Sequence, residues 1–173
     1  MAERLVLFLF KGDKDRCGDF AIALDHLKDL HNCSLCFNIA QDDKCLICLD
    51  KSRDTSKICV VEEALDIIPI ERTKSFTGLY HVLGGTLETN KATGSDLTIP
   101  QLLSRISDTD ITEVVIATNL TTEGDVTALY LKRKMDPLAI TVTRLARGLA
   151  TGSDIEYADD MTLKSALTNR AKM

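Results

Sequence analysis

Apolar and polar positions alternate along the chain in two different ways, and the change falls near residue 57. Before it, apolar residues recur at roughly a helical period over 1–31, with a break at 11–18. After it, short runs of consecutive apolar residues take turns with longer amphipathic stretches. Such runs are typical of strands buried on both faces, and the amphipathic stretches of helices that cover them. The pattern predicts a helical start followed by alternating strands and helices.

Four strands and four helices are expected in this second part. The strands are predicted at 58–61, 80–83, 113–118 and 140–145. The helices are predicted at 64–73, after a polar loop that reaches Thr98, at 123–135 and at 160–169. Pro100 fits the first turn of the second helix, where no amide donor is needed. Strands that alternate with helices imply an α/β fold with a mostly parallel sheet flanked by helices.

Residues 32–50 have few large apolar side chains, so neither helix nor strand is favoured there and this segment needs another source of stability. Its cysteines follow the pattern Cys-x2-Cys-x8-Cys-x2-Cys and are Cys33, Cys36, Cys45 and Cys48. Four thiolates in two close pairs suit the tetrahedral geometry and soft-ligand preference of zinc. They leave no position for water or substrate, so one structural Zn²⁺ per chain is expected. Free or redox-active cysteines and an iron-sulfur cluster are the alternatives, and colour would reveal the cluster.

Composition and charge narrow the class of protein. A chain of 173 residues with 45% hydrophobic side chains can bury a real core. The net charge of -5 lacks the strong basic field of a free-standing, tight nucleic-acid binder. The apolar stretch Leu5–Phe10 is too short to span a bilayer and is not followed by a small-residue cleavage site. We therefore expect a cytoplasmic protein without a membrane partner, in which disulfides are not favoured.

Polar groups follow two of the predicted strands. Glu62 and Glu63 come after the first strand, and the segment 118–125 comes after the third. In an open parallel sheet, functional groups gather at the carboxyl ends of the strands. A carboxylate at one strand end and an Asp-x-Asp at another would together hold Mg²⁺ for phosphoryl transfer.

Two segments resemble the signature segments of Toprim domains, which occur in topoisomerases, primases and recombination mediators. They are Val60-Val61-Glu62 and Ala117-Thr118-Asn119-x-Thr121-x-Glu123-Gly124. In catalytic members the second segment carries two aspartates where this chain has Asn119 and Thr121. Neutral oxygens cannot replace those charges for tight magnesium binding. The resemblance implies a non-catalytic site in which Glu62, Asn119, Thr121 and Glu123 contact a partner or a weak ion.

From about residue 20 to its end, the chain is similar to the RecR family. The resemblance is carried by 43–48, 80–85, 143–148 and 156–159, read as Asp-Lys-Cys-Leu-Ile-Cys, Tyr-His-Val-Leu-Gly-Gly, Thr-Arg-Leu-Ala-Arg-Gly and Glu-Tyr-Ala-Asp. It implies a non-enzymatic clamp or adaptor subunit, a dimer or a tetramer ring around DNA. Such a subunit acts with RecO or RecF and helps load the recombinase at single-stranded gaps. Arg144 and Arg147 are then candidate contacts to DNA or to a partner.

The same resemblance implies a domain layout. It comprises a helical remnant of a helix-hairpin-helix region at 1–31, a zinc finger at 32–52, a Toprim domain at 53–148, and a C-terminal loop and helix at 149–173 that packs on a neighbouring subunit. No Leu-Pro-Gly-Val-Gly-like turn precedes Cys33, so most of the helix-hairpin-helix is expected to be missing. The resemblance therefore does not decide whether this chain binds DNA or forms the ring. One alternative is an interaction module that has lost DNA binding.

Simpler interpretations stand beside these. Glu62 and Glu123 could support a magnesium-dependent Toprim nuclease or primase-like enzyme, or they could be acids that favour a helix N-terminus. Thr121 or Thr122 is a good helix cap. The basic cluster 132–134 falls in the last turn of a helix, where the helix dipole already favours it.

Overall fold

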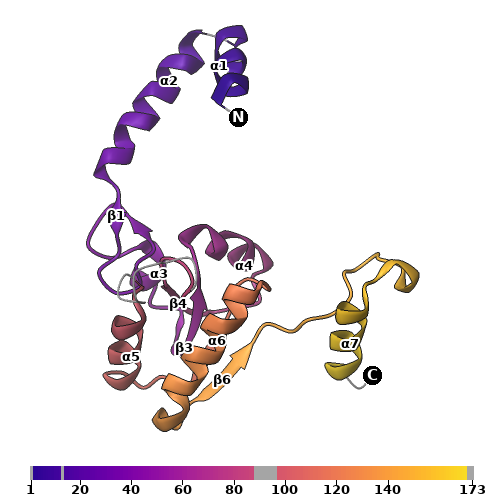
Figure 1. Cartoon of the computed structure of the whole chain (residues 1–173). Coiled ribbons are helices and arrows are strands. Elements are labelled where there is room, and N and C mark those ends of the chain that lie inside the picture. Colours follow the sequence, from indigo (N-terminus) through magenta and orange to yellow (C-terminus); the bar gives the residue numbers. More distant parts are fainter. Residues whose placement is uncertain (1, 13, 88–96, 171–173) are drawn as a thin grey trace.

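The computed structural model describes residues 2–12, 14–87 and 97–170 (Figure 1). Its body is built on a four-stranded sheet in the order β4-β3-β5-β6, with every neighbouring pair parallel. The strands are β3 (Asp54–Val61), β4 (Gly78–Val82), β5 (Glu113–Ile116) and β6 (Thr141–Arg144). The predicted α/β fold with a parallel sheet is confirmed, and β3 begins four residues before the predicted start at Ile58.

Helices cover both faces of this sheet (Figure 1). They are α4 (Ile67–Thr73), α5 (Ile99–Ser107) and α6 (Thr122–Met135), with the 3₁₀ turns η2 (Ala64–Asp66) and η3 (Asp136–Leu138) beside α4 and α6. On one face, α5 and α6 bury Leu102 and Leu131 against Ile58 and Val60 of β3. On the other face, α4 packs against Cys59 and Val61 together with the cysteine segment. The uninterrupted apolar run in β3 thus serves two cores, because successive side chains point to opposite faces.

The cysteine segment lies between the helical start and the sheet. It contains the short strands β1 (His31–Asn32) and β2 (Ile39–Ala40), which pair antiparallel, and the helix α3 (Leu46–Leu49). Regular elements were not expected here, and the observed ones are only two to four residues long. The buried cysteines form a small core of their own with Ala40.

The first helices are α1 (Ala2–Lys11) and α2 (Lys14–Asp25), followed by the 3₁₀ turn η1 (His26–Asp29). The predicted break at 11–18 is wrong in its extent, because α2 starts at Lys14. Figure 1 shows these helices rising away from the body. In the described part of the chain, every helix is too short or too polar to cross a membrane.

The chain leaves the body again after β6 and ends in the 3₁₀ turn η4 (Ile155–Tyr157) and the helix α7 (Asp160–Thr168) (Figure 1). Several apolar side chains on these two outlying segments are exposed: Leu5, Val6, Leu7, Phe8, Phe10, Ile155, Tyr157, Met161 and Leu167. Most of the predicted polar loop before Thr98 lies outside the described residues.

Candidate functional site

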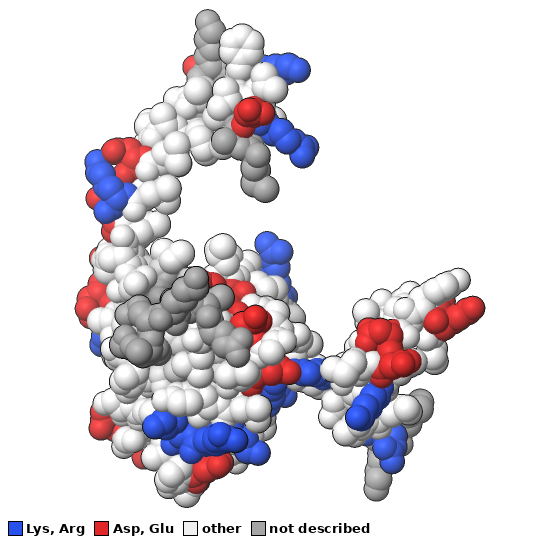
Figure 2. Space-filling model, viewed as in Figure 1, with Lys and Arg blue, Asp and Glu red and all other residues white. Residues whose placement is uncertain are grey.

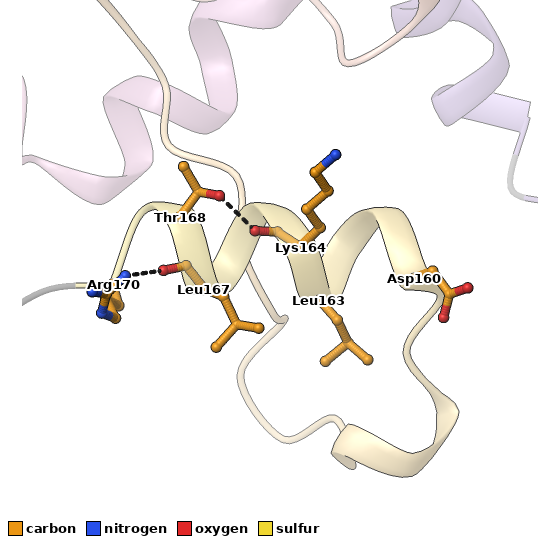
Figure 3. Close-up of a pocket in the computed structure, with 6 residues that line it drawn as sticks. All are labelled: Asp160, Leu163, Lys164, Leu167, Thr168 and Arg170. Atoms are coloured by element: carbon orange, nitrogen blue, oxygen red, sulfur yellow. Dashed lines mark hydrogen bonds between the residues drawn. The ribbon is translucent and has the colours of Figure 1, made fainter.

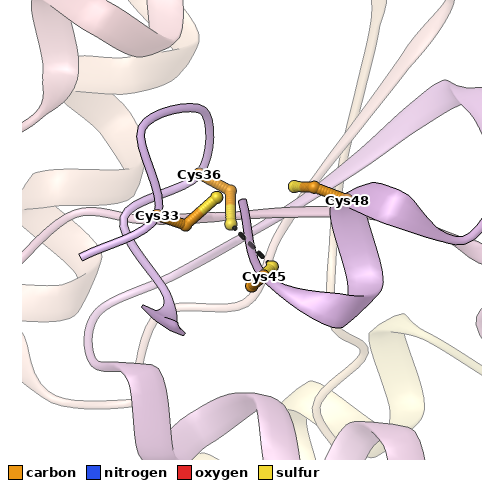
Figure 4. A group of neighbouring side chains, drawn as sticks. All are labelled: Cys33, Cys36, Cys45 and Cys48. Carbon is orange, nitrogen blue, oxygen red and sulfur yellow. Dashed lines mark hydrogen bonds between the residues drawn. The ribbon is translucent and has the colours of Figure 1, made fainter. Parts of the chain in front are cut away.

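Four sulfur atoms converge in the cysteine segment. Cys33 and Cys36 come from the turn between β1 and β2, while Cys45 precedes α3 and Cys48 lies in it (Figure 4). All four Sγ atoms lie within 4.8 Å of one another, and the Sγ atoms of Cys36 and Cys45 are 3.5 Å apart. None of these four cysteines forms a disulfide, and the first three are almost completely buried.

This donor set fits a tetrahedral metal ion. Ideal zinc-sulfur bonds of about 2.3 Å place the sulfurs of a tetrahedron about 3.8 Å apart, close to the spacing observed. Hydrogen bonding from the Cys36 thiol and the charge of the nearby Arg105 guanidinium together lower the pKa of Cys48 to about 6. The same hydrogen bond raises the pKa of Cys36, and burial raises the pKa of Cys45, so without a metal ion Cys48 is the thiol of these three that ionises most easily. A thiolate is the form that binds a metal. The cluster can therefore hold a metal ion, and four thiolates would leave no coordination site for a substrate.

A second group of polar residues lies at the carboxyl ends of β3 and β5. The carboxylate of Glu62 follows β3 and is only 7% exposed. The backbone amide of Asn119 donates to its Oε1 at 2.9 Å, and the Asn119 side-chain Nδ2 donates to its Oε2 at 2.5 Å. Each carboxylate oxygen of Glu62 thus accepts a hydrogen bond from the same residue, which lies in the loop after the neighbouring strand β5. We call this pair the Glu62 corner.

The position of the corner follows from the strand order. From β3 the chain goes to β4 on one side of the sheet, and it later returns to β5 on the other side. The crevice at such a switch point is where open α/β sheets bind ligands. In this chain the hydrogen bonds between Glu62 and Asn119 span that crevice.

Gly124 allows the start of α6 to approach this corner closely. A Cβ atom at Gly124 would lie 2.1 Å from the Asn119 carbonyl oxygen and 2.9 Å from Glu62 Oε1. The Thr121 hydroxyl accepts a hydrogen bond from the Gly124 amide at 3.1 Å and caps the helix, as its sequence position predicts. Glu123 lies in the first turn of α6, where the helix dipole favours an acid.

Two arginines meet a carboxylate of their own chain beside this corner. Asp125 Oδ1 accepts hydrogen bonds from Arg144 Nη2, at 2.6 Å, and from Arg147 Nη2. Burial alone would raise the pKa of Asp125, but the two guanidinium groups outweigh it and hold that pKa below its usual value. Arg144 also lies 3.4 Å from the Thr118 hydroxyl. The structure therefore ties both candidate arginines to α6.

Comparison with known proteins assigns this chain to a family. The Toprim domain family matches residues 56–146, and the family described as RecR, C-terminal matches residues 148–171. Recombination protein RecR of Enterococcus faecalis is 48% identical over 174 residues, which cover 99% of this chain and 88% of the relative. The RecR proteins of Lactiplantibacillus plantarum and Cutibacterium acnes are 49% and 44% identical, covering 88% and 85% of their own length. The chain belongs to the RecR family.

Membership in the RecR family confirms the resemblance seen in the sequence. The roles of the individual residues stay predictions, although the structure brings them together in three groups. The four cysteines form one cluster, Glu62 and Asn119 form the corner with Thr121 and Glu123 at the adjacent helix start, and Arg144 and Arg147 meet at Asp125.

Sequence reasoning did not assign the partners that complete these groups. Asp125 was noted only as part of a segment, and its pairing with Arg144 joins residues 19 positions apart. Arg105, whose side chain reaches the cysteine segment, lies in an ordinary amphipathic helix. A lone arginine on a helix carries no local signal of such a contact.

Proposed function

We propose that this chain is a non-enzymatic clamp or adaptor subunit in recombinational DNA repair. In this proposal it acts with RecO or RecF and helps to load the recombinase at single-stranded gaps in DNA. Family membership supports the recombination role, since the relatives are named as recombination proteins.

The non-enzymatic part of the proposal depends mainly on one observation: the hydrogen bonding of Glu62. Magnesium catalysis needs several carboxylate oxygens that converge on an open position. Here both oxygens of Glu62 accept hydrogen bonds from Asn119, and Thr121 caps α6. By resemblance, a neutral amide stands where a Toprim enzyme has a charged ligand, which supports the proposal that this corner stabilises the carboxyl end of the sheet and does not hold a catalytic ion.

The proposed cofactor is one structural Zn²⁺ held by Cys33, Cys36, Cys45 and Cys48. The mutual distances of the four sulfurs support it, as does the shortage of apolar side chains in this segment. Bound zinc would supply a crosslink that stabilises the segment, as in other four-thiolate sites. The paired spacing of these cysteines is more typical of a metal site in a reducing compartment than of disulfides, which supports the proposed cytoplasmic location.

Assembly into a dimer or a tetramer ring is the second part of the proposal. It would bury the apolar residues exposed on α1 and α7. Figure 3 shows Leu163 and Leu167 projecting from the same face of α7, away from Lys164. In the proposed layout, 1–31 is a helix-hairpin-helix remnant, 32–52 the zinc finger, 53–148 the Toprim domain, and 149–173 a segment that packs on a neighbouring subunit.

DNA contact is proposed to be weak for a single subunit. Figure 2 shows acidic and basic side chains interspersed on the face in view, without a continuous basic surface. Arg144 and Arg147 are proposed to contact phosphate or an acidic partner, although Asp125 now neutralises part of their charge. Affinity would then come from several subunits acting together and from RecO or RecF.

A gel-shift experiment tests the repair function. The purified chain is mixed with gapped DNA at several salt concentrations, with and without RecO. We expect weak, salt-sensitive binding by the chain alone and a stronger complex when RecO is present. The absence of any complex in both conditions would contradict the clamp proposal and favour an interaction module without DNA binding.

A nuclease assay with Mg²⁺ tests the non-enzymatic assignment. The wild type and the Glu62→Gln variant are incubated with single-stranded and gapped DNA, and Glu63→Gln, at an exposed neighbouring position, is the control. We expect no cleavage by any of the three proteins. Cleavage by the wild type and by Glu63→Gln that disappears in Glu62→Gln would show a Toprim enzyme.

A further inference from the structure

The cysteine segment covers the open edge of the sheet. Strand β4 pairs with β3 on one side only, so its other side presents unpaired backbone groups. The Val82 amide on that side donates to the Cys36 carbonyl oxygen at 2.8 Å. One residue of the four-cysteine cluster therefore serves both as a candidate metal ligand and as the hydrogen-bond partner of the sheet edge.

An aromatic contact lies beside this hydrogen bond. Phe37 follows Cys36 directly, has a left-handed backbone with φ 62°, and turns its ring against His81 of β4, with ring centroids 5.4 Å apart. His81 is completely buried, and its Nε2 is 3.1 Å and 3.0 Å from the carbonyl and hydroxyl oxygens of Thr98. The strained backbone at Phe37 is held on one side by the cysteine turn and on the other by β4.

Arg105, in α5, contacts both the cysteine segment and strand β4. Its Nη1 donates to the Tyr80 carbonyl oxygen of β4 at 2.8 Å and lies 3.5 Å from the carbonyl oxygen of Leu35. Leu35 stands between Cys33 and Cys36, so the guanidinium reaches into the turn that carries two of the four sulfurs. The neighbouring Leu102 and Ile106 are buried in the main core, which anchors α5.

The charge of Arg105 also suits this position. Four thiolates around a divalent cation carry a net charge of about −2, which a nearby cation stabilises. A guanidinium stays protonated under all ordinary conditions and presents several donors in a planar fork, which a lysine does not. Groups that position metal ligands without touching the metal commonly change metal affinity by about 10-fold to 100-fold.

We propose that Arg105 is a positioning residue of the four-cysteine centre. Its contacts couple metal binding in the cluster to the conformational stability of strand β4. The inference rests on the proposed zinc site. Because coupling between two sites is reciprocal, removal of the metal loosens β4, and loss of the Arg105 contacts weakens the metal site.

The test uses the full chain and three variants. Arg105→Gln removes the charge and the fork, Arg105→Lys keeps the charge alone, and Arg133→Gln removes an exposed arginine from α6 as a control. The rate of zinc transfer to the chelator 4-(2-pyridylazo)resorcinol is measured together with amide hydrogen exchange in β4. We expect transfer about 10-fold faster in Arg105→Gln, an intermediate rate in Arg105→Lys and no change in Arg133→Gln.

A second measurement uses the wild type, so that poor folding of a variant leaves the test intact. Hydrogen exchange is compared between the zinc-loaded protein and the reduced, zinc-stripped protein. We expect the amide of Val82 and the rest of β4 to lose protection on stripping, while β5 and β6 keep theirs. Equal protection of β4 in both states, or wild-type zinc transfer in a folded Arg105→Gln, would overturn the coupling. A wild type purified without any metal would instead refute the proposed zinc site.

Discussion

The four-cysteine cluster and the Glu62 corner were both predicted from short sequence motifs, but the structure gives their side chains different neighbours. In the cluster, four soft donors of one type face one another within 4.8 Å. In the corner, the carboxylate oxygens already accept two hydrogen bonds from Asn119. The comparison teaches that the neighbours of a side chain matter as much as its type: the four sulfurs converge on one another, whereas the Glu62 carboxylate faces a neutral amide that donates to it. The predictions that follow test each half of this contrast.

The largest effect is expected from Cys45→Ser. Loss of one thiolate should reduce zinc from about one per chain to below about a tenth, because structural sites need all four ligands. Zinc contributes about 10–16 kcal/mol to the folding of small zinc domains, so 32–52 should unfold locally and assembly should weaken. Mass spectrometry of the metal and circular dichroism measure the two changes. Cys17→Ser, in the exposed part of α2, is the control and should keep its zinc.

Asn119→Asp should produce the next largest effect. It replaces the donor to Glu62 with a second carboxylate, so the free energy of unfolding should fall by about 3 kcal/mol at pH 7. Repulsion raises the pKa of one carboxyl in the folded state, so the penalty should shrink as pH falls through that pKa. Millimolar Mg²⁺ should also restore part of the stability.

Urea unfolding with and without Mg²⁺ measures this change. Leu120→Asp is the matched control, because it adds the same charge at an exposed position one residue away. We expect it to change stability by less than about 0.5 kcal/mol and to show no response to the ion. A variant Asn119→Asp with wild-type stability would contradict the importance of the hydrogen bonds in the corner.

Gly124→Ala should lower stability by about 2 kcal/mol, a typical cost of overpacking. The added methyl group would meet the backbone of Asn119 at 2.1 Å, so the start of α6 must move away from the corner. This outcome opposes helix propensity, which favours Ala over Gly by about 1 kcal/mol. Thermal unfolding compares it with Gly148→Ala, where a Cβ would meet nothing within 4 Å. Equal melting temperatures in the two variants would show that the corner is loosely packed.

The smallest effect is expected from Asp125→Asn. Its ion pairs with Arg144 and Arg147 are partly exposed, so stability at pH 7 should fall by only about 0.5 kcal/mol. The pKa of Asp125 is held below its usual value, so the wild-type advantage should be present above about pH 4 and disappear as pH falls further. Unfolding at pH 7 and pH 3 measures this. Asp110→Asn, at an exposed turn, is the control.

Much of the fold was predictable from local patterns. The apolar run at 58–61, Pro100 near a helix start and the paired cysteines each report on their own segment. Strand and helix positions were therefore correct to within a few residues, apart from the early starts of β3 and of α2. The short elements around the cysteines were missed, because they depend on the cluster and carry no hydrophobic period.

The sequence by itself determined the alternation of strands and helices, the cysteine spacing and the family resemblance, because each is written in neighbouring residues. Only the tertiary structure decided that Asn119 donates a hydrogen bond to Glu62, 57 positions away, and that the Cys36 carbonyl oxygen accepts one from the Val82 amide. The first contact follows from the strand order β4-β3-β5-β6, which places the ends of β3 and β5 side by side, and the second from the cysteine segment packing on the free edge of β4. Local burial patterns are nearly the same for any order of parallel strands, so they could not reveal which polar groups would satisfy one another.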